Sequence, residues 1–174
     1  MGQITEDRIL FEDNHLIAVF KHASDIVQGD KTGDKPLSEH VKTFLKDKYN
    51  KPGNVFCGVI HRIDRPVSGV VLFAKTSKAL ARMNAQFQDK SVKKTYWAVV
   101  KNRPNPENGK LIHHLKKNQK KNKSFPTSER DGKKSELDYS LVKSSDTYHL
   151  LQINPITGRH HQIRCQLSAA GMPI

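Results

Sequence analysis

One short polar run constrains this chain more than any other feature, and it reads His61-Arg62-Ile63-Asp64-Arg65-Pro66-Val67-Ser68-Gly69. Apolar stretches flank it, from Val55 to Ile60 and from Val70 to Ala74, which predicts two strands joined by a polar turn. The run places the carboxylate of Asp64 between two guanidinium groups. A nearby opposite charge favours the ionised form, so we expect Asp64 to suit nucleophilic or electrostatic work. A surface ion-pair cluster at a turn explains this run equally well when it is taken alone.

Size and composition indicate one soluble domain. The 174 residues suffice for one sizeable core, and 36% hydrophobic with 27% charged residues is ordinary for a globular protein. No apolar run approaches membrane-spanning length, and no secretory signal is recognisable at the amino terminus. Two cysteines make no disulfide framework. We therefore expect a cytoplasmic protein with no membrane partner.

Positive charge is concentrated in one part of the sequence. The chain has 30 Lys and Arg against 17 Asp and Glu, a formal net charge of +13. Between Lys93 and Lys134 there are 13 basic residues and three acids, so this segment holds +10 of the total. A stripe of this sign attracts phosphate backbones, although an isolated lysine run is more often a solvated face. The concentration favours a nucleic-acid partner.

Local patterns predict an α+β fold with a mixed, mostly antiparallel sheet and flanking helices. Alternating or β-branched residues predict strands at 8–12, 15–21, 55–60, 70–74, 95–100, 111–115, 137–142 and 148–153. Helical spacing predicts helices from Pro36 to about Tyr49, from Thr76 or Ser77 to about Lys90, and from a cap at Thr157 to Gly171. Residues 116–134 are lysine-rich and lack periodicity, so we expect an exposed basic loop or hairpin tip there.

Two further segments carry groups suited to chemistry. In the strand Lys94–Val99, Tyr96 and Ala98 lie on one face and Trp97 on the other, because side chains alternate along a strand. The segment Ile156–Arg164 combines a helix start with two arginines and two histidines. Arginines and backbone N–H groups at a helix start form an anion site, for a phosphate or for a carboxylate such as Asp64.

Together these motifs resemble a known family. HRIDRPVSGVVLFAKT is similar to the HRLDRxTSGLLLxAKT signature of RNA pseudouridine synthases, in the branch that modifies large-subunit ribosomal RNA. KTYWAVV resembles the family's KxYxAxV, and TGRHHQIRCQLSAAGMPI resembles its TGRxHQIRxHLxxxGxPI. The opening RILFEDNHLIAVFKH fits the family's first hairpin. The resemblance covers residues 8–174, and three ordered motifs are far more specific than one short pattern.

The resemblance implies a pseudouridine synthase-like catalytic core. Asp64 matches the aspartate that attacks the flipped-out uridine, Tyr96 the tyrosine that stacks on the uracil, and Arg164 the arginine that pairs with the aspartate. It implies isomerisation of a uridine in ribosomal or transfer RNA to pseudouridine, without a metal or an organic cofactor. The residues that we expect to contact the RNA are His61, Arg62, Arg65, Arg159, His161, Lys116, Lys117, Lys120 and Lys121.

The chain departs from the family pattern in several places. Where the family has Asn-Lys-Pro-x-Gly, only Lys21 matches. Val67 replaces a threonine and thereby removes a hydroxyl, and Gln166 replaces a histidine. Family members continue beyond the Gly-x-Pro-Ile sequence with which this chain ends. We therefore expect residues 1–174 to form a single catalytic domain that is incomplete at its carboxy terminus, and a monomer.

Two alternatives to the enzyme remain open. The first is a non-catalytic RNA-binding module on the same fold, which would bind RNA and leave uridines unmodified. The second is a zinc-stapled nucleic-acid-binding domain, in which the ligands are Cys57, His61, His161 and Cys165. Structural zinc sites usually contain a tighter cysteine pair, so the spacing disfavours zinc.

Overall fold

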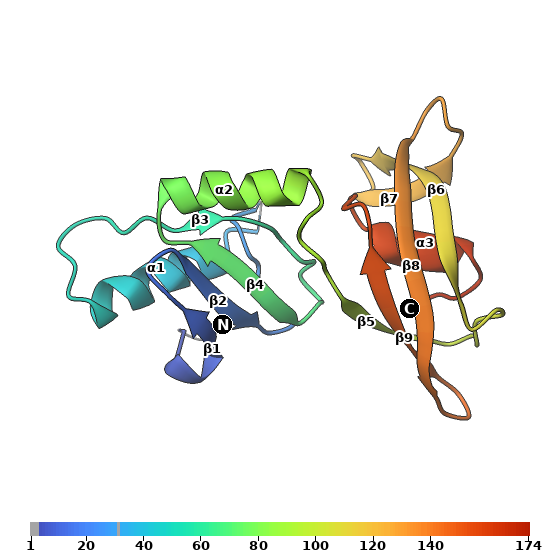
Figure 1. The fold of residues 1–174 in the computed structure, drawn as a ribbon, viewed down its shortest axis with the longest axis horizontal. Coiled ribbons are helices and arrows are strands. Elements are labelled where there is room, and N and C mark those ends of the chain that lie inside the picture. Colours follow the sequence, from blue (N-terminus) through green and yellow to red (C-terminus); the bar gives the residue numbers. More distant parts are fainter. Residues whose placement is uncertain (1–3, 31) are drawn as a thin grey trace. The chain divides into compact units, whose positions relative to one another are not determined.

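Two separate antiparallel sheets organise the chain (Figure 1). The computed structural model describes residues 4–30 and 32–174. These residues divide into two compact units, Met1–Asp89 and Lys90–Ile174, each with its own sheet and core. The predicted α+β class with mostly antiparallel strands is confirmed. That the whole chain acts as one catalytic domain stays a prediction, since each unit is described by itself.

The first unit contains a four-stranded sheet in the order β1-β2-β4-β3. Its elements are the 3-10 helix η1 (Glu6–Arg8), β1 (Ile9–Glu12), β2 (Leu16–Lys21), α1 (Leu37–Lys48), β3 (Gly58–Val59), β4 (Gly69–Ala74) and α2 (Ser77–Gln88). Alternation along β4 sends Val71 and Phe73 into the core that α1 covers. Leu72 and Ala74 point to the other face, into the cluster that α2 covers. Helices therefore pack on both faces of this sheet.

In both helices of the first unit, a backbone N–H group of the first turn donates a hydrogen bond to an acceptor outside the helix. The hydroxyl of Thr76 accepts a hydrogen bond from the N–H of Ala79 at 3.1 Å, so the predicted cap of α2 is confirmed. No side chain caps α1, but the N–H of Leu37 donates to the carbonyl of Ile26 at 2.7 Å. The loop after β2 is thereby attached to the start of α1, which satisfies a donor that a helix start leaves unpaired.

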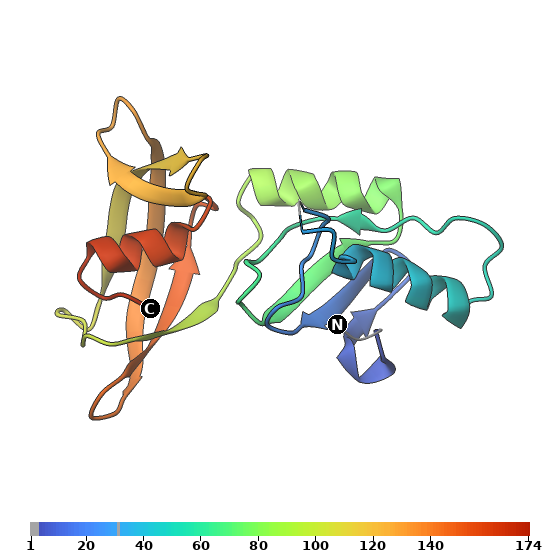
Figure 2. The ribbon, with the colours of Figure 1, turned by 180° about the vertical axis from the view of Figure 1, so that it is seen from behind.

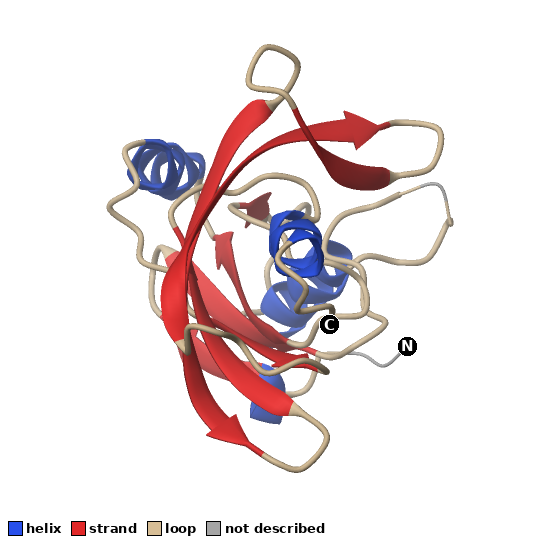
Figure 3. Ribbon diagram, turned by 90° about the vertical axis from the view of Figure 1, so that its right-hand side faces the viewer, coloured by secondary structure: helices blue, strands red, loops and turns tan. Residues whose placement is uncertain are grey.

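The second unit contains a five-stranded sheet in the order β5-β9-β8-β6-β7. Its elements are β5 (Tyr96–Val100), β6 (Asn108–Asn118), β7 (Lys123–Thr127), β8 (Lys133–Ser144), β9 (His149–Pro155) and α3 (Gln162–Ala169). The strands curve around α3, which lies against one face of the sheet (Figures 2 and 3). Leu137, Leu151, Ile153 and Leu167 are fully buried between them. Each such side chain stabilises the fold by roughly 1.5–3 kcal/mol relative to exposure.

Two predicted boundaries are wrong. The expected strand at 55–60 shrinks to β3, two residues that pair with β4. The expected cap at Thr157 lies five residues before α3, which begins after His161 in a left-handed conformation (φ 49°). The hydroxyl of Thr157 instead accepts from the N–H of Glu136 at 2.9 Å and donates to the side chain of Gln162 at 2.8 Å. It therefore joins the segment before the helix to β8.

The predicted basic loop at 116–134 is largely a β-hairpin. The end of β6 and all of β7 pair from His114 with Thr127 to Asn118 with Lys123, which leaves only the turns at 119–122 and 128–132 outside strands. The strands were not predicted here because polar residues occupy both faces of the hairpin, so apolar and polar residues do not alternate along the sequence. None of the helices in residues 4–30 and 32–174 is long and apolar enough to cross a membrane.

Gly132 allows the second of these turns to lie close to β6. A Cβ atom at this position would come within 2.8 Å of the backbone carbonyl carbon of His114 and 2.6 Å of the Thr127 methyl group. We expect Gly132→Ala to lower the free energy of unfolding by about 1–3 kcal/mol, because overpacking forces the backbone to shift. Chemical denaturation measures the loss.

Gly29→Ala is the matched control. Nothing lies within 4 Å of the Cβ atom that this change adds, so the free energy of unfolding should stay within about 0.5 kcal/mol of the original. Equal stability of the two variants would contradict the close approach at Gly132.

Candidate functional site

Asp64 lies in the segment between β3 and β4 and is partly buried. Its carbonyl accepts a hydrogen bond from the N–H of Val67 at 3.0 Å, which closes a turn directly after the carboxylate. The segment ends at Gly69, whose φ of +146° is rarely adopted by residues with a side chain. The Ser68-Gly69 pair thus returns the chain to β4. The backbone that follows Asp64 is thus constrained by the Val67 hydrogen bond and by the conformation of Gly69.

A buried ammonium group holds this turn against the sheet. Lys21, the last residue of β2, is 0% exposed, and its Nζ donates to the carbonyls of Val67 at 2.6 Å and of Arg65 at 3.0 Å. A third bond reaches the carbonyl of His22 at 3.0 Å. Burial lowers the pKa of Lys21 from its usual value, whereas the charges of Asp25 and Asp64 act in the opposite direction. Lys21 therefore fixes the backbone of the Asp64 turn and places a cation near its carboxylate.

A buried ion pair supports the loop that follows Lys21. Arg8 and Asp25 form a salt bridge in which both side chains are largely buried. The guanidinium of Arg8 also donates to the carbonyl of Phe20 at 3.1 Å, and the carboxylate of Asp25 accepts from the N–H of His22 at 3.2 Å. The loop meets the Asp64 turn directly, because the N–H of Ser24 donates to the carbonyl of Arg65 at 2.9 Å.

The two arginines beside Asp64 have different surroundings. Both are exposed. The guanidinium of Arg65 forms an ion pair with Asp34 at 2.8 Å, so one of the two predicted flanking cations is partly neutralised from within the unit. Arg62 reaches only the side-chain oxygen of Gln28, at 3.5 Å. Arg62 is accordingly the better placed of the two to take a phosphate.

His61 points toward the protein. Its Nε2 accepts a hydrogen bond from the N–H of Leu72 at 3.1 Å, and its ring stacks on Phe87 of α2 with ring centroids 5.4 Å apart. These contacts attach the start of the motif to β4 and to α2. They give His61 a supporting role, and its contact with RNA stays a prediction.

Tyr96 and Arg164 both belong to the second unit. Tyr96 begins β5 opposite Ile153, and its side chain packs against the core between the sheet and α3, on the face predicted for it. Arg164 is exposed on the first turn of α3. Asp64 belongs to the first unit, so the joint site of the three residues stays a prediction.

Gln162 organises the segment that precedes Arg164. It is 4% exposed, and its side-chain oxygen accepts from the hydroxyl of Thr157 at 2.8 Å and from the N–H of Arg159 at 2.9 Å. Its side-chain nitrogen donates to the carbonyl of Glu136 on β8 at 3.1 Å. This role of Gln162 was not predicted from the sequence. A glutamine in the first turn of a helix, five residues after a threonine, was the available signal.

The basic segment lies beside the same loop. Ser124 on β7 donates to the carbonyl of His160 at 2.6 Å, and Arg159 donates through Nε to the carbonyl of Lys134 at 3.3 Å. The rings of His160 and His161 stack with centroids 3.8 Å apart. The predicted RNA-contacting residues of the second unit thus gather on one hairpin and the loop attached to it. The four lysines predicted to contact RNA are exposed: Lys116, Lys117, Lys120 and Lys121.

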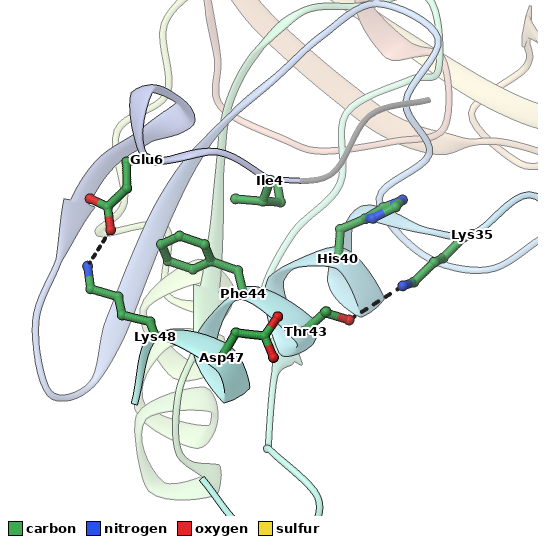
Figure 4. Close-up of a pocket in the computed structure, with 8 residues that line it drawn as sticks. All are labelled: Ile4, Glu6, Lys35, His40, Thr43, Phe44, Asp47 and Lys48. Atoms are coloured by element: carbon green, nitrogen blue, oxygen red, sulfur yellow. Dashed lines mark hydrogen bonds and ion pairs between the residues drawn. The ribbon is translucent and has the colours of Figure 1, made fainter. Parts of the chain in front are cut away.

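A hollow of the first unit lies elsewhere. It measures about 450 Å³ beside α1, and Ile4, Phe44 and His40 line it (Figure 4). The ion pair between Glu6 and Lys48, at 3.4 Å, lies at its rim. None of the residues predicted to act in chemistry or RNA binding lines this hollow. It does not belong to the candidate site.

The zinc alternative finds little support in its donor set. Burial raises the pKa of the Cys57 thiol to about 12 and also raises that of Cys165, whereas zinc binds the thiolate. Nε2 of His61 is already engaged by the N–H of Leu72. In the part of the chain that the structure describes, no three His, Cys, Asp or Glu side chains are grouped to hold a metal ion.

Comparison with known proteins identifies the family. The sequence profile described as RNA pseudouridylate synthase matches residues 15–169, a range that includes Asp64, Tyr96 and Arg164. The chain therefore belongs to the RNA pseudouridylate synthase family, and the resemblance drawn from the three motifs is confirmed.

Curated relatives agree with this assignment. The chain is 35% identical over 169 residues to ribosomal large subunit pseudouridine synthase C of Buchnera aphidicola, and 32% identical over 171 residues to ribosomal large subunit pseudouridine synthase D of Borreliella burgdorferi. These matches cover 97% and 95% of this chain and 52% of each relative. The chain spans about half the length of the curated relatives it matches.

Solved structures share the fold. The human protein titled RNA Pseudouridylate Synthase Domain Containing 4 aligns with a TM-score of 0.82 at 22% identity, over 97% of this chain and 66% of that chain. The human protein titled RNA Pseudouridylate Synthase Domain Containing 1 aligns with a TM-score of 0.75 at 21% identity, over 95% of this chain and 65% of that chain. At these identities the likeness shows the fold alone.

Removing the ammonium group of Lys21 should loosen the Asp64 turn. Lys21→Met keeps the length of the side chain but removes a donor from three carbonyls, and those of Arg65 and His22 keep a backbone N–H donor. We expect the loss of these hydrogen bonds to cost about 1–3 kcal/mol of unfolding free energy. Because the turn is less tightly held in this variant, we also expect faster tryptic cleavage after Arg62 in the native protein. Arg62 is the site to follow, since Arg65 precedes a proline and resists trypsin. Denaturation and limited proteolysis with mass spectrometry measure the two effects.

The exposed residue Lys78 offers the control, and Lys78→Met should leave the stability and the cleavage after Arg62 unchanged. If Lys21→Met matched this control in both measurements, the turn would not depend on the buried ammonium group.

Proposed function

We propose that this chain carries the catalytic core of an RNA pseudouridine synthase, which isomerises one uridine of structured RNA to pseudouridine. The reaction breaks the glycosidic bond between N1 and C1′, turns the uracil and joins C5 to C1′. The proton lost from C5 is balanced by the proton gained at N1, so the product is an isomer of the substrate. The reaction consumes no co-reactant, and we propose that no metal or organic cofactor takes part.

The observation that carries the proposal is the rigid support of Asp64. Its turn is attached to β2 by Lys21, and Arg8 and Asp25 hold the loop beside it. A nucleophile needs a carboxylate in a constant position, and Lys21 holds the turn that carries Asp64 through hydrogen bonds to the carbonyls of Arg65 and Val67. We propose that Asp64 is the nucleophile, with Arg62 taking a phosphate of the RNA next to it.

Tyr96 and Arg164 complete the proposed chemistry. A uridine within an RNA stack must be turned out before its glycosidic bond is accessible, and stacking on an aromatic ring holds the extruded base. We assign the stacking to Tyr96 and the pairing with the Asp64 carboxylate to Arg164. Gln162 acts through the backbone that leads into Arg164 and is a positioning residue.

The uneven charge supports RNA as the partner. Residues 90–174 contain 17 Lys and Arg against six Asp and Glu, a net +11 of the total +13. We propose that Lys116, Lys117, Lys120 and Lys121 bind phosphates together with Arg159 and His161, and that His61 and Arg65 contact the strand near Asp64. The names of the curated relatives favour ribosomal RNA as the substrate, and we propose a cytoplasmic monomer as the acting form.

Asp64→Asn should abolish isomerisation in the complete protein. The amide keeps the size of the side chain but cannot act as the nucleophile, so we expect the rate to fall by roughly 10⁴-fold or more. Release of tritium from RNA labelled at C5 of uridine measures the rate. RNA affinity and thermal stability should change little.

Asp146→Asn, in the exposed turn before β9, removes the same charge and should leave the rate unchanged. Pseudouridine formation by Asp64→Asn at the original rate would reject the enzymatic assignment. RNA binding without modification by the unaltered protein would instead favour the non-catalytic module.

The lysines of the hairpin should determine the salt dependence of RNA binding. Replacing Lys116, Lys117, Lys120 and Lys121 together by alanine should weaken binding and reduce the slope of log affinity against log salt by about 3, at roughly 0.7–0.9 per lost phosphate contact. Titration of labelled RNA at several salt concentrations measures the slope. The control removes the same charge from exposed sites of the first unit, namely Lys35, Lys46, Lys51 and Lys78. Equal slopes in the two variants would exclude the hairpin as the phosphate contact.

A further inference from the structure

The hairpin of β6 and β7 has two faces with different surroundings. Ser124 points toward the loop before α3, because its hydroxyl donates to the carbonyl of His160 at 2.6 Å and lies 3.1 Å from Nδ1 of the same residue. Side chains alternate along a strand, so Lys123 and Phe125 point to the opposite face. Pairing across the hairpin places Lys116 opposite Phe125 on that face.

An aromatic ring therefore lies among cations on an open surface. Phe125 is 42% exposed and belongs to none of the buried clusters of the described residues. Lys116 lies opposite it, and Lys123 lies two residues before it on the same strand. The next row of this face consists of Thr127, His114 and Lys134.

Acidic residues are few on this face. Glu129 approaches His114 at 3.9 Å with a side chain that is 89% exposed, and Glu136 lies one row beyond, opposite Ile112. No acidic residue is paired with Phe125 or with its neighbours on β7. A phosphate backbone passing the ring would meet positive charge on both sides.

The edge of the hairpin is unsuited to pairing with another protein strand. β7 is the outer strand of the sheet in the described residues and spans only five residues. It contains Pro126, which lacks a backbone N–H, and it begins with Lys123. Short edge strands with proline and lysine oppose strand addition. The exposed face, rather than the edge, is the surface available to a partner.

We propose that Phe125 is a stacking site for an unpaired base of RNA, with Lys116 and Lys123 binding the phosphates beside that base. Aromatic side chains interleaved with lysines are the usual means of holding single-stranded RNA, because every base offers a face to stack on. The site is separate from the proposed uracil site at Tyr96. This proposal rests on the proposed function only in taking RNA as the ligand. It adds that the bound RNA has an unpaired nucleotide at the hairpin.

The test measures binding of a labelled 12-nucleotide oligouridylate and of a blunt 12-base-pair RNA duplex to the full chain carrying Asp64→Asn. Phe125→Ala and Phe125→Leu should each weaken oligouridylate binding by about 5- to 100-fold, whereas Phe125→Trp should retain it. The salt slope should stay unchanged in all three, because no charge is lost. Lys116→Ala should reduce the slope by about 0.7. Duplex binding should not respond to the phenylalanine variants.

Tyr148→Ala removes another exposed aromatic residue, 55% exposed, in the turn before β9, and serves as the matched control. It should bind as the unaltered chain does. If Phe125→Leu bound oligouridylate as tightly as the unaltered chain does, an apolar side chain would suffice at this position, and the proposal would be overturned. Equal losses in Phe125→Ala and Tyr148→Ala, or equal losses for oligouridylate and duplex, would overturn it as well.

Fluorescence gives a second measurement that does not depend on affinity. Trp97 is the single tryptophan of the chain, so Trp97→Phe combined with Phe125→Trp yields one tryptophan at the proposed site. Stacking by oligouridylate should quench its emission, and unchanged emission at saturation would contradict stacking. If the unaltered protein released no tritium, the proposed enzymatic function would be rejected but the stacking site at Phe125 would not, since these binding measurements do not require turnover.

Discussion

The candidate site depends on the hydrogen bonds that the buried ammonium group of Lys21 donates. A charged group that is 0% exposed is stable only when every proton finds an acceptor, and here all three acceptors are backbone carbonyls. Two of them belong to the turn that carries Asp64. The position of the carboxylate is thus tied to the end of β2, where Ile17 and Val19 anchor the strand in the core. The turn therefore needs the folded sheet to hold it in place.

The second unit uses neutral amides where the first uses charges. Gln162 connects the segment before α3 to β8, and Gln166 is fully buried with its side-chain nitrogen donating to the carbonyls of Leu111 and Ser135. These bonds attach the helix to the sheet without burying a net charge, which avoids the large desolvation cost that an ion would incur. The loop from Thr157 to His161 is therefore attached to the sheet by side-chain hydrogen bonds.

Much of this organisation was predictable from the sequence, for reasons that differ between elements. The strands at β2 and β4 and the helix α2 were predictable because their apolar residues follow one face and Thr76 supplies a cap. The strand β7 was not, since lysines and other polar residues leave no periodicity, although a hairpin tip was one of the two predictions for this segment. The importance of Lys21 was visible only as one matching residue in a motif that otherwise departs from the family. Its role depends on carbonyls 44 and 46 residues away, which local patterns do not encode.

The division of charge between the units has a consequence for encounter with a polyanion. Residues 1–89 contain 13 basic and 11 acidic residues, a net +2, whereas residues 90–174 carry +11. At physiological salt, where the Debye length is about 8 Å, a polyanion is therefore attracted chiefly to the second unit. Under the proposed function, the phosphates of the RNA would therefore meet the lysine-rich unit before the nearly neutral unit that carries Asp64.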